Sequence, residues 1–228
     1  MEAHTQQARR LDLEMVSLNV ARRDVARYMK RLYEMGYVLD QEGNISTRTA
    51  KTDRYVITPS QVPRYLINPT DILVVNGQGD VIAGNRNPSI ETGMHLLIYS
   101  RRSDVGSVMH FHSLHATALA ALHETIPAIL EELIPFLGED VPTVPYAMAG
   151  TEELASNVAN GLADRNAVLL ANHGAVVCGK DLQDAFHKAR LLERVATVYT
   201  LAKHIGEPTR LPDSSLEVGR ELFRMMLS

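Results

Sequence analysis

The chain has 228 residues, 45% of them hydrophobic, so it is long enough to bury a substantial core and falls within the usual size of one domain. Its net charge of -4, from 23 basic and 27 acidic residues, gives no electrostatic reason to expect nucleic acid as a partner. A single cysteine excludes an internal disulfide, and no run approaches the roughly 18 apolar residues of a membrane helix, so we expect a cytoplasmic protein that does not bind membranes.

The first predicted element is a long helix. Residues 1–20 form a polar, basic lead-in and the start of this helix, without the apolar stretch of a secretory signal. Over residues 11–35 apolar side chains recur at helical intervals among many charges, and Gly36 follows as a C-terminal glycine should. This pattern predicts one amphipathic helix that ends at Gly36.

The next part of the chain is predicted to be rich in strands. We interpret the segment Gly43-Asn44-Ile45-Ser46 as a turn. Pro88-Ser89 opens a helix over residues 90–101, with Glu91 in its first turn, where a carboxylate suits the helix dipole. Short apolar runs bounded by turn residues predict strands at residues 55–58, 71–76, 80–83 and 105–111.

The second half alternates helices with short strands. Two apolar runs, 167–171 and 175–178, are broken by Asn172-His173-Gly174, which predicts two buried strands joined by a tight turn. A proline-punctuated connection lies between the first two helices of this half. We expect helices at residues 114–122, 151–163, 181–204 and 216–227, the first three beginning at Ser113, Thr151 and Asp181.

These elements predict an α/β fold. The strands cluster enough to form one central, mainly antiparallel sheet with helices on both faces, so we predict a single three-layer α/β/α domain. Its main part covers residues 21–210, and residues 211–228 form a C-terminal helical segment. No repeat or long linker divides the chain.

A pair of histidines at the end of a predicted strand suggests a metal site. Residues two apart on a strand point to the same face about 6.6 Å apart, so His110 and His112 can reach one ion. His173, in the polar turn between two apolar strands, is a third candidate, and Gly174 beside it lets the backbone approach another group closely. Three imidazoles are a suitable ligand set for catalytic zinc.

Each of these features also has an ordinary structural explanation. A lone His-x-His motif is more often a pair of strand-end histidines, and only the wider arrangement favours a metal. His115 and His123, on the following helix, are left outside the metal site. Glu91 could serve the helix dipole alone, and the turns around Gly43 and at Thr58-Pro59-Ser60 could be local backbone chemistry.

Five short motifs, taken in order, resemble the class II aldolase/adducin-head family, which includes the fuculose-phosphate aldolases. The similarity covers about residues 21–199, and its specificity comes from the order and spacing of the motifs. They are Gly43-Asn44-Ile45-Ser46, Ile57-Thr58-Pro59-Ser60, Pro88-Ser89-Ile90-Glu91, His110-Phe111-His112-Ser113 and Asn172-His173-Gly174.

The resemblance implies a metal-dependent enzyme with an α/β/α domain. It implies zinc, with manganese or cobalt as alternatives, held by His110, His112 and His173, with Glu91 as fourth ligand and acid/base. It also implies a homotetramer with active sites at subunit interfaces. The substrate phosphate in such aldolases lies in a cradle that corresponds here to Gly43, Asn44, Ser60 and Ser89.

The sequence departs from the family pattern at three positions. Gln61 stands where the family usually has glycine and Ile90 where it often has serine, so we expect phosphate to be bound less tightly. Glu131 falls where the fuculose-phosphate aldolases carry a tyrosine that donates a proton from the adjacent subunit. We therefore expect Glu131 to be a second catalytic proton-transfer group, with Glu131 and Glu132 as a solvated turn being the alternative.

We predict a zinc-dependent lyase of the aldolase type. It would cleave a carbon–carbon bond of a small sugar-phosphate or keto/hydroxy-acid substrate through a metal-stabilised enediolate. The same site in relatives of this kind also serves sugar-phosphate 4-epimerases, dehydratases and decarboxylases. A non-catalytic, adducin-like assembly module is the alternative from another class, and the presence of all four implied metal ligands argues against it.

Overall fold

The computed structural model describes the backbone of residues 2–49 and 53–227, and the side chains of residues 17–49 and 53–226. The described helices are α1 (Glu2–Glu34), α2 (Thr92–Arg101), α3 (Leu114–Ala121), α4 (Leu133–Leu137), α5 (Glu152–Leu162), α6 (Leu182–Ile205) and α7 (Asp213–Leu227). The described strands are β1 (Asn44–Arg48), β2 (Tyr55–Ile57), β3 (Leu73–Val75), β4 (Val81–Ala83), β5 (Ser107–Phe111), β6 (Thr143–Val144), β7 (Ala167–Leu170) and β8 (Gly174–Gly179).

The described strands form one sheet in the order β4-β3-β2-β1-β5-β8-β7-β6. All neighbours pair antiparallel except β6 and β7, which are parallel. The predicted mainly antiparallel sheet is therefore confirmed. Because β1, β5 and β8 lie in the middle of the sheet and are buried along nearly their whole length, residues on them have fixed positions.

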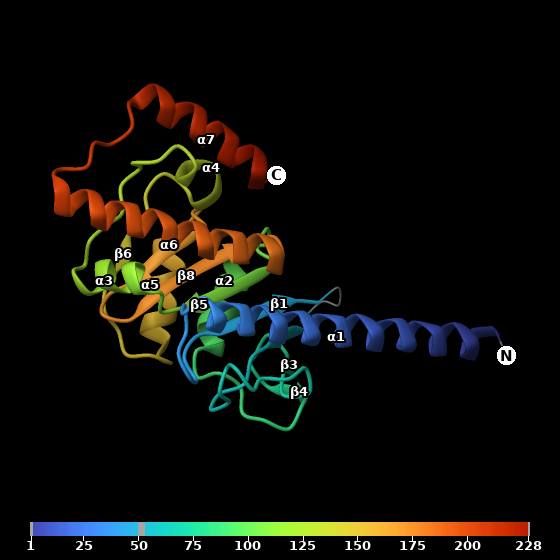
Figure 1. Ribbon diagram of the computed structural model, residues 1–228. Coiled ribbons are helices and arrows are strands. Elements are labelled where there is room, and N and C mark those ends of the chain that lie inside the picture. The colour runs from blue at the N-terminus through green and yellow to red at the C-terminus, as the bar shows by residue number, and fades with distance from the viewer. Residues whose placement is uncertain (1, 50–52, 228) are drawn as a thin grey trace.

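Helices cover both faces of this sheet, so the predicted three-layer α/β/α arrangement is confirmed (Figure 1). Side chains that alternate along each strand enter two separate cores. On β8, Ala175 and Val177 pack under α1, α3 and α6, whereas Val176 and Cys178 pack under α2 and α5. On β5, Val108 faces α2 and α5, so His110, two residues later, points to that same side.

Most predicted elements are present, but the start of the chain and its middle differ. Helix α1 begins at Glu2, nine residues before the predicted start, so the lead-in is helical in its backbone. The segment predicted as a turn at Gly43-Asn44-Ile45-Ser46 is mostly strand β1, with Gly43 just before it. The proline-punctuated connection contains two unpredicted elements, α4 and β6.

Two helix starts also differ from the prediction. Helix α2 begins at Thr92, so Glu91 occupies the position before the first turn and makes no capping hydrogen bond. Ser113 precedes α3 as predicted, but its side chain does not cap the helix. The carboxylate of Glu193 on α6 does so instead, accepting hydrogen bonds from the backbone N–H groups of His115 and Ala116.

The C-terminal helical segment packs against the rest of the protein. Leu216 on α7 is buried against Ala128 and Ile134, and a β-carbon at Gly219 would lie 2.6 Å from a methyl carbon of Ile134. Close contact with α4 therefore fixes the position of α7. None of the described helices combines the length and the apolar composition that crossing a membrane requires.

Candidate metal centre and active site

Three imidazoles converge beside the central strands. His110 lies on β5, His112 follows the end of β5, and His173 lies in the turn between β7 and β8. One ring nitrogen from each histidine lies within 4.8 Å of the others, and the ring centroids are 4.7–5.0 Å apart. This arrangement is the one predicted from the His-x-His pattern and the Asn-His-Gly turn.

The outward-facing nitrogens of two of these rings have partners of their own. His110 Nδ1 donates to the carbonyl oxygen of Ala175 at 3.0 Å, which leaves Nε2 with its lone pair toward the cluster. His112 Nδ1 lies 3.4 Å from a carboxylate oxygen of Glu42. Such contacts to a carbonyl or a carboxylate orient the imidazoles that bind metals.

Burial keeps the same two imidazoles neutral. Removal from water lowers the pKa of His110 to about 3 and that of His112 to about 4, and each effect is reinforced by the neighbouring histidines. A neutral imidazole is the form that coordinates a metal. The His110 and His112 Nε2 atoms are 2.9 Å apart, compared with about 3.4 Å between two nitrogens bound to one tetrahedral zinc at 2.1 Å. The donor set therefore fits a divalent ion.

Gly174 permits this close approach. A β-carbon there would lie 2.5 Å from His112 Cδ2 and 2.6 Å from the carbonyl oxygen of Phe111. Any side chain at this position would displace the His112 ring or the end of β5. The role expected of Gly174 from the sequence, to let the backbone come close to another group, is thus what the structure shows.

Glu91 faces the histidine cluster from the residue before α2. Its side chain is 6% exposed, with Oε2 3.3 Å from His110 Nε2 and Oε1 3.7 Å from His173 Nε2. Oε1 is buried and has no hydrogen-bond partner among the described residues. A buried carboxylate oxygen without a donor is costly, so this oxygen is suited to a cation or a reacting proton. The cluster of three imidazole nitrogens thus has an oxygen of Glu91 available as a fourth ligand.

The amide of Asn44 is committed to Glu91 and not to a cradle. Asn44 Nδ2 donates to Glu91 Oε2 at 2.7 Å, and Asn44 Oδ1 lies 2.5 Å from His95 Nε2. Only 3% of Asn44 is exposed. Because this amide is already occupied in orienting Glu91, a contact of Asn44 with phosphate would come from its backbone, and that contact stays a prediction.

The remaining cradle residues lie on neighbouring loops. Ser60 donates weakly, at 3.3 Å, to the carbonyl of Asn87, and Ser89 accepts from the backbone N–H of Glu91. Gly43 has φ +64°, and a β-carbon there would lie 2.7 Å from the carbonyl oxygen of His110. Gln61 also has positive φ, 56°, so it keeps the backbone form that glycine favours. Weaker binding of phosphate stays a prediction.

A buried arginine joins the two loops of this cradle. Arg64 is 2% exposed, and all five of its N–H groups donate to backbone carbonyls. Its burial lowers its pKa to about 10. The acceptors, at 2.6–3.3 Å, are the carbonyl oxygens of Gln41, Glu42, Gly43, Pro59 and Val62. Arg64 was not singled out in the sequence, because nothing in its immediate neighbours distinguishes it from a surface arginine.

Glu131 is not part of the histidine cluster within one chain. It is exposed and lies in a groove between α4 and α7, lined in part by Ile134, Leu211 and Leu222. The apolar residues around Glu131 in the sequence predict partial burial, but that prediction is wrong for the single chain, since Leu133 and Ile134 turn inward and leave Glu131 outside. Glu132 is half-buried and lies 3.8 Å from Arg194.

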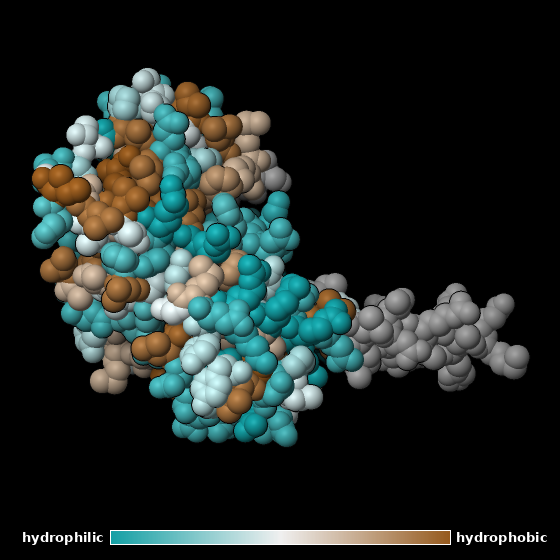
Figure 2. Space-filling view, in the orientation of Figure 1, coloured by the Kyte–Doolittle hydropathy of each residue, from teal (hydrophilic) through white to brown (hydrophobic). Residues whose placement is uncertain are grey.

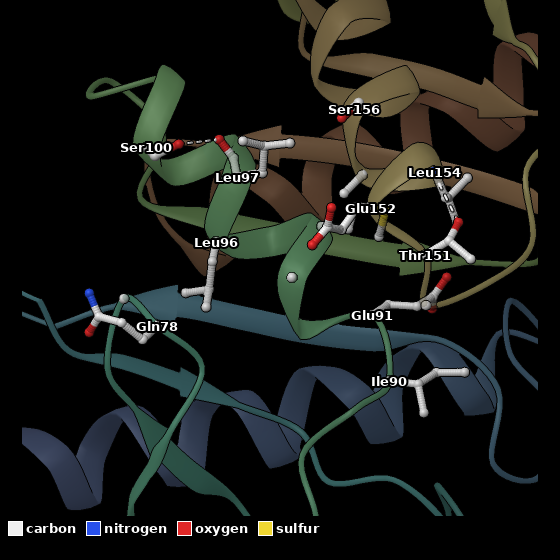
Figure 3. A pocket seen from close by; sticks show the side chains of 15 residues that line it. Gln78, Ile90, Glu91, Leu96, Leu97, Ser100, Thr151, Glu152, Leu154 and Ser156 are labelled. Carbon is white, nitrogen blue, oxygen red and sulfur yellow. Dashed lines mark hydrogen bonds between the residues drawn. The ribbon is translucent and has the colours of Figure 1, made fainter.

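A cavity of about 470 Å³, with Glu91 in its lining, lies between α2 and the start of α5. Figure 3 shows Glu91 and Ile90 at its lower edge, with Thr151 and Glu152 across from α2. None of the three histidines lines it.

His115 also lies apart from the cluster, and its Nδ1 donates to Glu193 at 2.9 Å.

Comparison with known proteins identifies relatives along most of the chain. The family described as Class II Aldolase and Adducin N-terminal domain matches residues 23–200. The 5-deoxy-D-ribulose 1-phosphate aldolase of Bacillus thuringiensis serovar kurstaki is 37% identical over 200 residues, which are 88% of this chain and 93% of the relative. The L-fuculose phosphate aldolase of Haemophilus influenzae is 39% identical over 69% of this chain and 71% of its own length.

Solved structures agree with these relatives. An L-fuculose 1-phosphate aldolase superimposes with a TM-score of 0.85 at 38% identity, covering 90% of this chain and 96% of that one. YgbL of Escherichia coli, provisionally assigned as an aldolase, epimerase or decarboxylase, superimposes with a TM-score of 0.81 at 28% identity over 89% of this chain and 99% of its own.

The histidine cluster makes a prediction about metal content. The purified protein should carry close to one divalent ion per chain, and His112→Ala should lose most of it, because two imidazoles make a poor site. Elemental analysis after dialysis measures this. His204→Ala, which removes an exposed histidine in the last turn of α6, outside the cluster, is the matched control and should keep its metal. Full occupancy in His112→Ala would mean that the metal binds elsewhere.

Arg64 makes a prediction about stability. Arg64→Met should lower the free energy of unfolding by about 2–4 kcal/mol, because buried carbonyls lose their donors. Urea denaturation measures the change. Arg86→Met removes an arginine from an exposed ion pair with Asp71 and should cost less than about 1 kcal/mol. Equal losses in the two variants would show that Arg64 does not hold the loops together.

Proposed function

Because the chain belongs to the Class II Aldolase and Adducin N-terminal domain family and is an aldolase-type lyase, we propose that it cleaves a ketose 1-phosphate. The observation that supports this most is the convergence of His110, His112 and His173 with the unpartnered oxygen of Glu91. Class II aldolases are metal-dependent. Zinc is the metal we propose, since three imidazoles and a carboxylate oxygen suit it, with manganese or cobalt as alternatives.

The two relatives suggest which part of the substrate is shared. The names 5-deoxy-D-ribulose 1-phosphate aldolase and L-fuculose 1-phosphate aldolase both describe a ketose with phosphate on C1, and the sugars differ only beyond C3. Breaking the C3–C4 bond of either gives the same phosphorylated three-carbon ketone, glycerone phosphate, and a different aldehyde. We propose that this chain binds the shared half at the histidine cluster and the cradle, so the aldehyde half sets its preference.

A divalent ion at the cluster would draw electrons from the substrate's C2 carbonyl and C3 hydroxyl oxygens. The residues of the chain move the protons. As the C4 hydroxyl loses its proton, C4 becomes an aldehyde and the C3–C4 electron pair passes to C3, which then receives a proton. Glu91 is the group that gives C3 its proton, because its free oxygen faces the cluster. It enters the step protonated and regains a proton from solvent after the products leave.

We propose that Glu131 of one subunit reaches the histidine cluster of a neighbouring subunit and takes the C4 hydroxyl proton of the substrate bound there. Its groove adjoins exposed apolar side chains on α7, among them Val218, Leu222 and Met225, and Figure 2 shows hydrophobic residues gathered over this end of the molecule. A homotetramer that covers such a surface would bury Glu131 and bring it to another chain's cluster. The proposed location of this small-molecule enzyme is cytoplasmic.

Two other classes of function, a different reaction at the same site and a non-catalytic role, are less well supported. The alternatives of epimerase, dehydratase or decarboxylase need the same metal and differ in the group that handles the second proton. A non-catalytic, adducin-like module would have no need for a buried carboxylate oxygen without a partner or for three imidazoles that converge beside it. Aldol cleavage therefore remains the function that we propose.

The proposal predicts turnover that depends on Glu91. The zinc-loaded protein should release glycerone phosphate from 5-deoxy-D-ribulose 1-phosphate or L-fuculose 1-phosphate, and faster than from the unphosphorylated ketoses or keto acids. Glu91→Gln should keep the metal and reduce turnover by on the order of 10²–10⁴. A coupled assay for glycerone phosphate measures the substrate preference of the wild-type protein and the loss of turnover in Glu91→Gln.

The control for this substitution is Glu153→Gln, which changes an exposed carboxylate in the first turn of α5. It should leave turnover unchanged. Wild-type turnover from Glu91→Gln would return Glu91 to a structural role, and release of a product other than an aldehyde and glycerone phosphate would favour one of the alternative reactions.

Glu131 predicts a separate effect. Glu131→Gln should lower turnover while metal content and the tetramer remain, because an amide cannot accept the C4 hydroxyl proton. Glu132→Gln, at the neighbouring residue, should do much less. Steady-state rates and light scattering measure these properties. Small, equal effects from the two substitutions would support the solvated-turn explanation.

A further inference from the structure

A continuous chain of buried hydrogen bonds runs from Glu91 into the protein between α2 and β1. Glu91, His95 and Tyr99 are four residues apart, so they lie along one face of α2 and its preceding residue. Asn44 and Ser46 are two residues apart on β1 and point to the face that α2 covers. The contacts alternate between helix and strand, in the order Glu91, Asn44, His95, Ser46, Tyr99.

The geometry of the two elements makes this alternation possible. Four residues of helix advance by about 6 Å. Two residues of strand advance by about 6.7 Å. Because the two steps nearly match, each strand residue meets two helix residues, with distances of 2.5–2.8 Å along the whole chain. All five residues are 6% exposed or less, so water does not compete for these bonds.

The chemistry of each atom fixes the direction of the bonds. The Asn44 amide donates to the Glu91 carboxylate, so its oxygen faces His95 and can only accept. His95 Nε2 must therefore carry the proton, and Nδ1 keeps a lone pair. Ser46 donates its only proton to that lone pair, and its oxygen then accepts from Tyr99. Every donor points toward Glu91.

We propose that Ser46, His95 and Tyr99 are positioning residues that hold the Asn44 amide with its N–H toward Glu91 and so keep the Glu91 carboxylate aimed at the histidine cluster. This inference rests on the proposed acid/base role of Glu91. To reverse the amide, the His95 tautomer and both hydroxyl rotors must change together, because any single change leaves a buried donor facing a donor or an acceptor facing an acceptor. The chain of bonds therefore has one favoured direction.

The simpler explanation is that these side chains only satisfy one another in the core. A neighbouring pair of hydroxyls allows the two explanations to be separated. Thr47 Oγ1 and Ser107 Oγ are also buried between β1 and β5, 2.8 Å apart, but they connect to neither Glu91 nor the histidines. Loss of a hydroxyl there removes a comparable buried bond without touching the chain that leads to Glu91.

Selective ¹⁵N-histidine NMR of the full-length protein tests the direction of the bonds. The signals of His95, one of nine histidines, are identified by their loss in His95→Gln. We expect the neutral tautomer protonated on Nε2. The tautomer protonated on Nδ1 would overturn the proposal. This measurement needs no substrate, so it stands even if the proposed aldolase reaction fails.

Kinetics of three variants test the consequence, with 5-deoxy-D-ribulose 1-phosphate and L-fuculose 1-phosphate as the probes. Ser46→Ala should lower kcat about tenfold, the value of one ordinary hydrogen bond, while KM stays within about twofold and zinc content is unchanged. Ser46→Thr, which keeps the hydroxyl, should restore kcat. Ser107→Ala should lose a similar amount of thermal stability and keep wild-type kcat.

The outcomes separate the possible failures. Unchanged kcat in Ser46→Ala, or an equal loss in Ser107→Ala, would overturn the positioning role while leaving the aldolase function in place. If the wild-type protein releases no glycerone phosphate from either probe, the proposed function fails, and the NMR result alone then decides the direction of the hydrogen bonds.

Discussion

The antiparallel register of β5 against β8 determines where the three imidazoles meet. Phe111 pairs with Ala175, so His112, which follows the last residue of β5, and His173, which precedes the first residue of β8, lie at the same edge of the sheet. His110 faces the cluster from inside β5, and its ring is held by the carbonyl of Ala175 on β8. A shift of one residue would turn His110 to the opposite face and disperse the cluster.

Strand β1 is the second support of the site. Asn44 pairs with His110, so the residue that binds Glu91 lies directly beside a ligand histidine. Gly43 before it fits against the end of β5 where no side chain could, and Arg64 holds its carbonyl. The same short strand thus aligns the carboxylate, the edge of the cradle and the buried chain of hydrogen bonds that leads to Tyr99.

The layers, most helices and the histidine cluster could be predicted from the sequence, because hydrophobic periodicity and the His-x-His and Asn-His-Gly patterns are local. Strand β1 was misread, since Gly43-Asn44 is typical of turns and β1 is held by pairing with distant strands. The positions of Asn44 relative to His95, and of Arg64 relative to two loops, depend on such pairings too. Glu131 is exposed in the single chain, and the role we propose for it requires a second chain, whose contacts no local pattern predicts.

The central claim is that the three histidines and Glu91 hold one divalent ion for aldol cleavage. A crystal structure with data collected at the zinc absorption edge tests it most directly. We predict one anomalous peak per chain at about 2.0–2.1 Å from one nitrogen each of His110, His112 and His173, with a Glu91 oxygen completing or adjoining the coordination. Zinc-loaded crystals with no peak there, or with the peak at another site, would contradict the account.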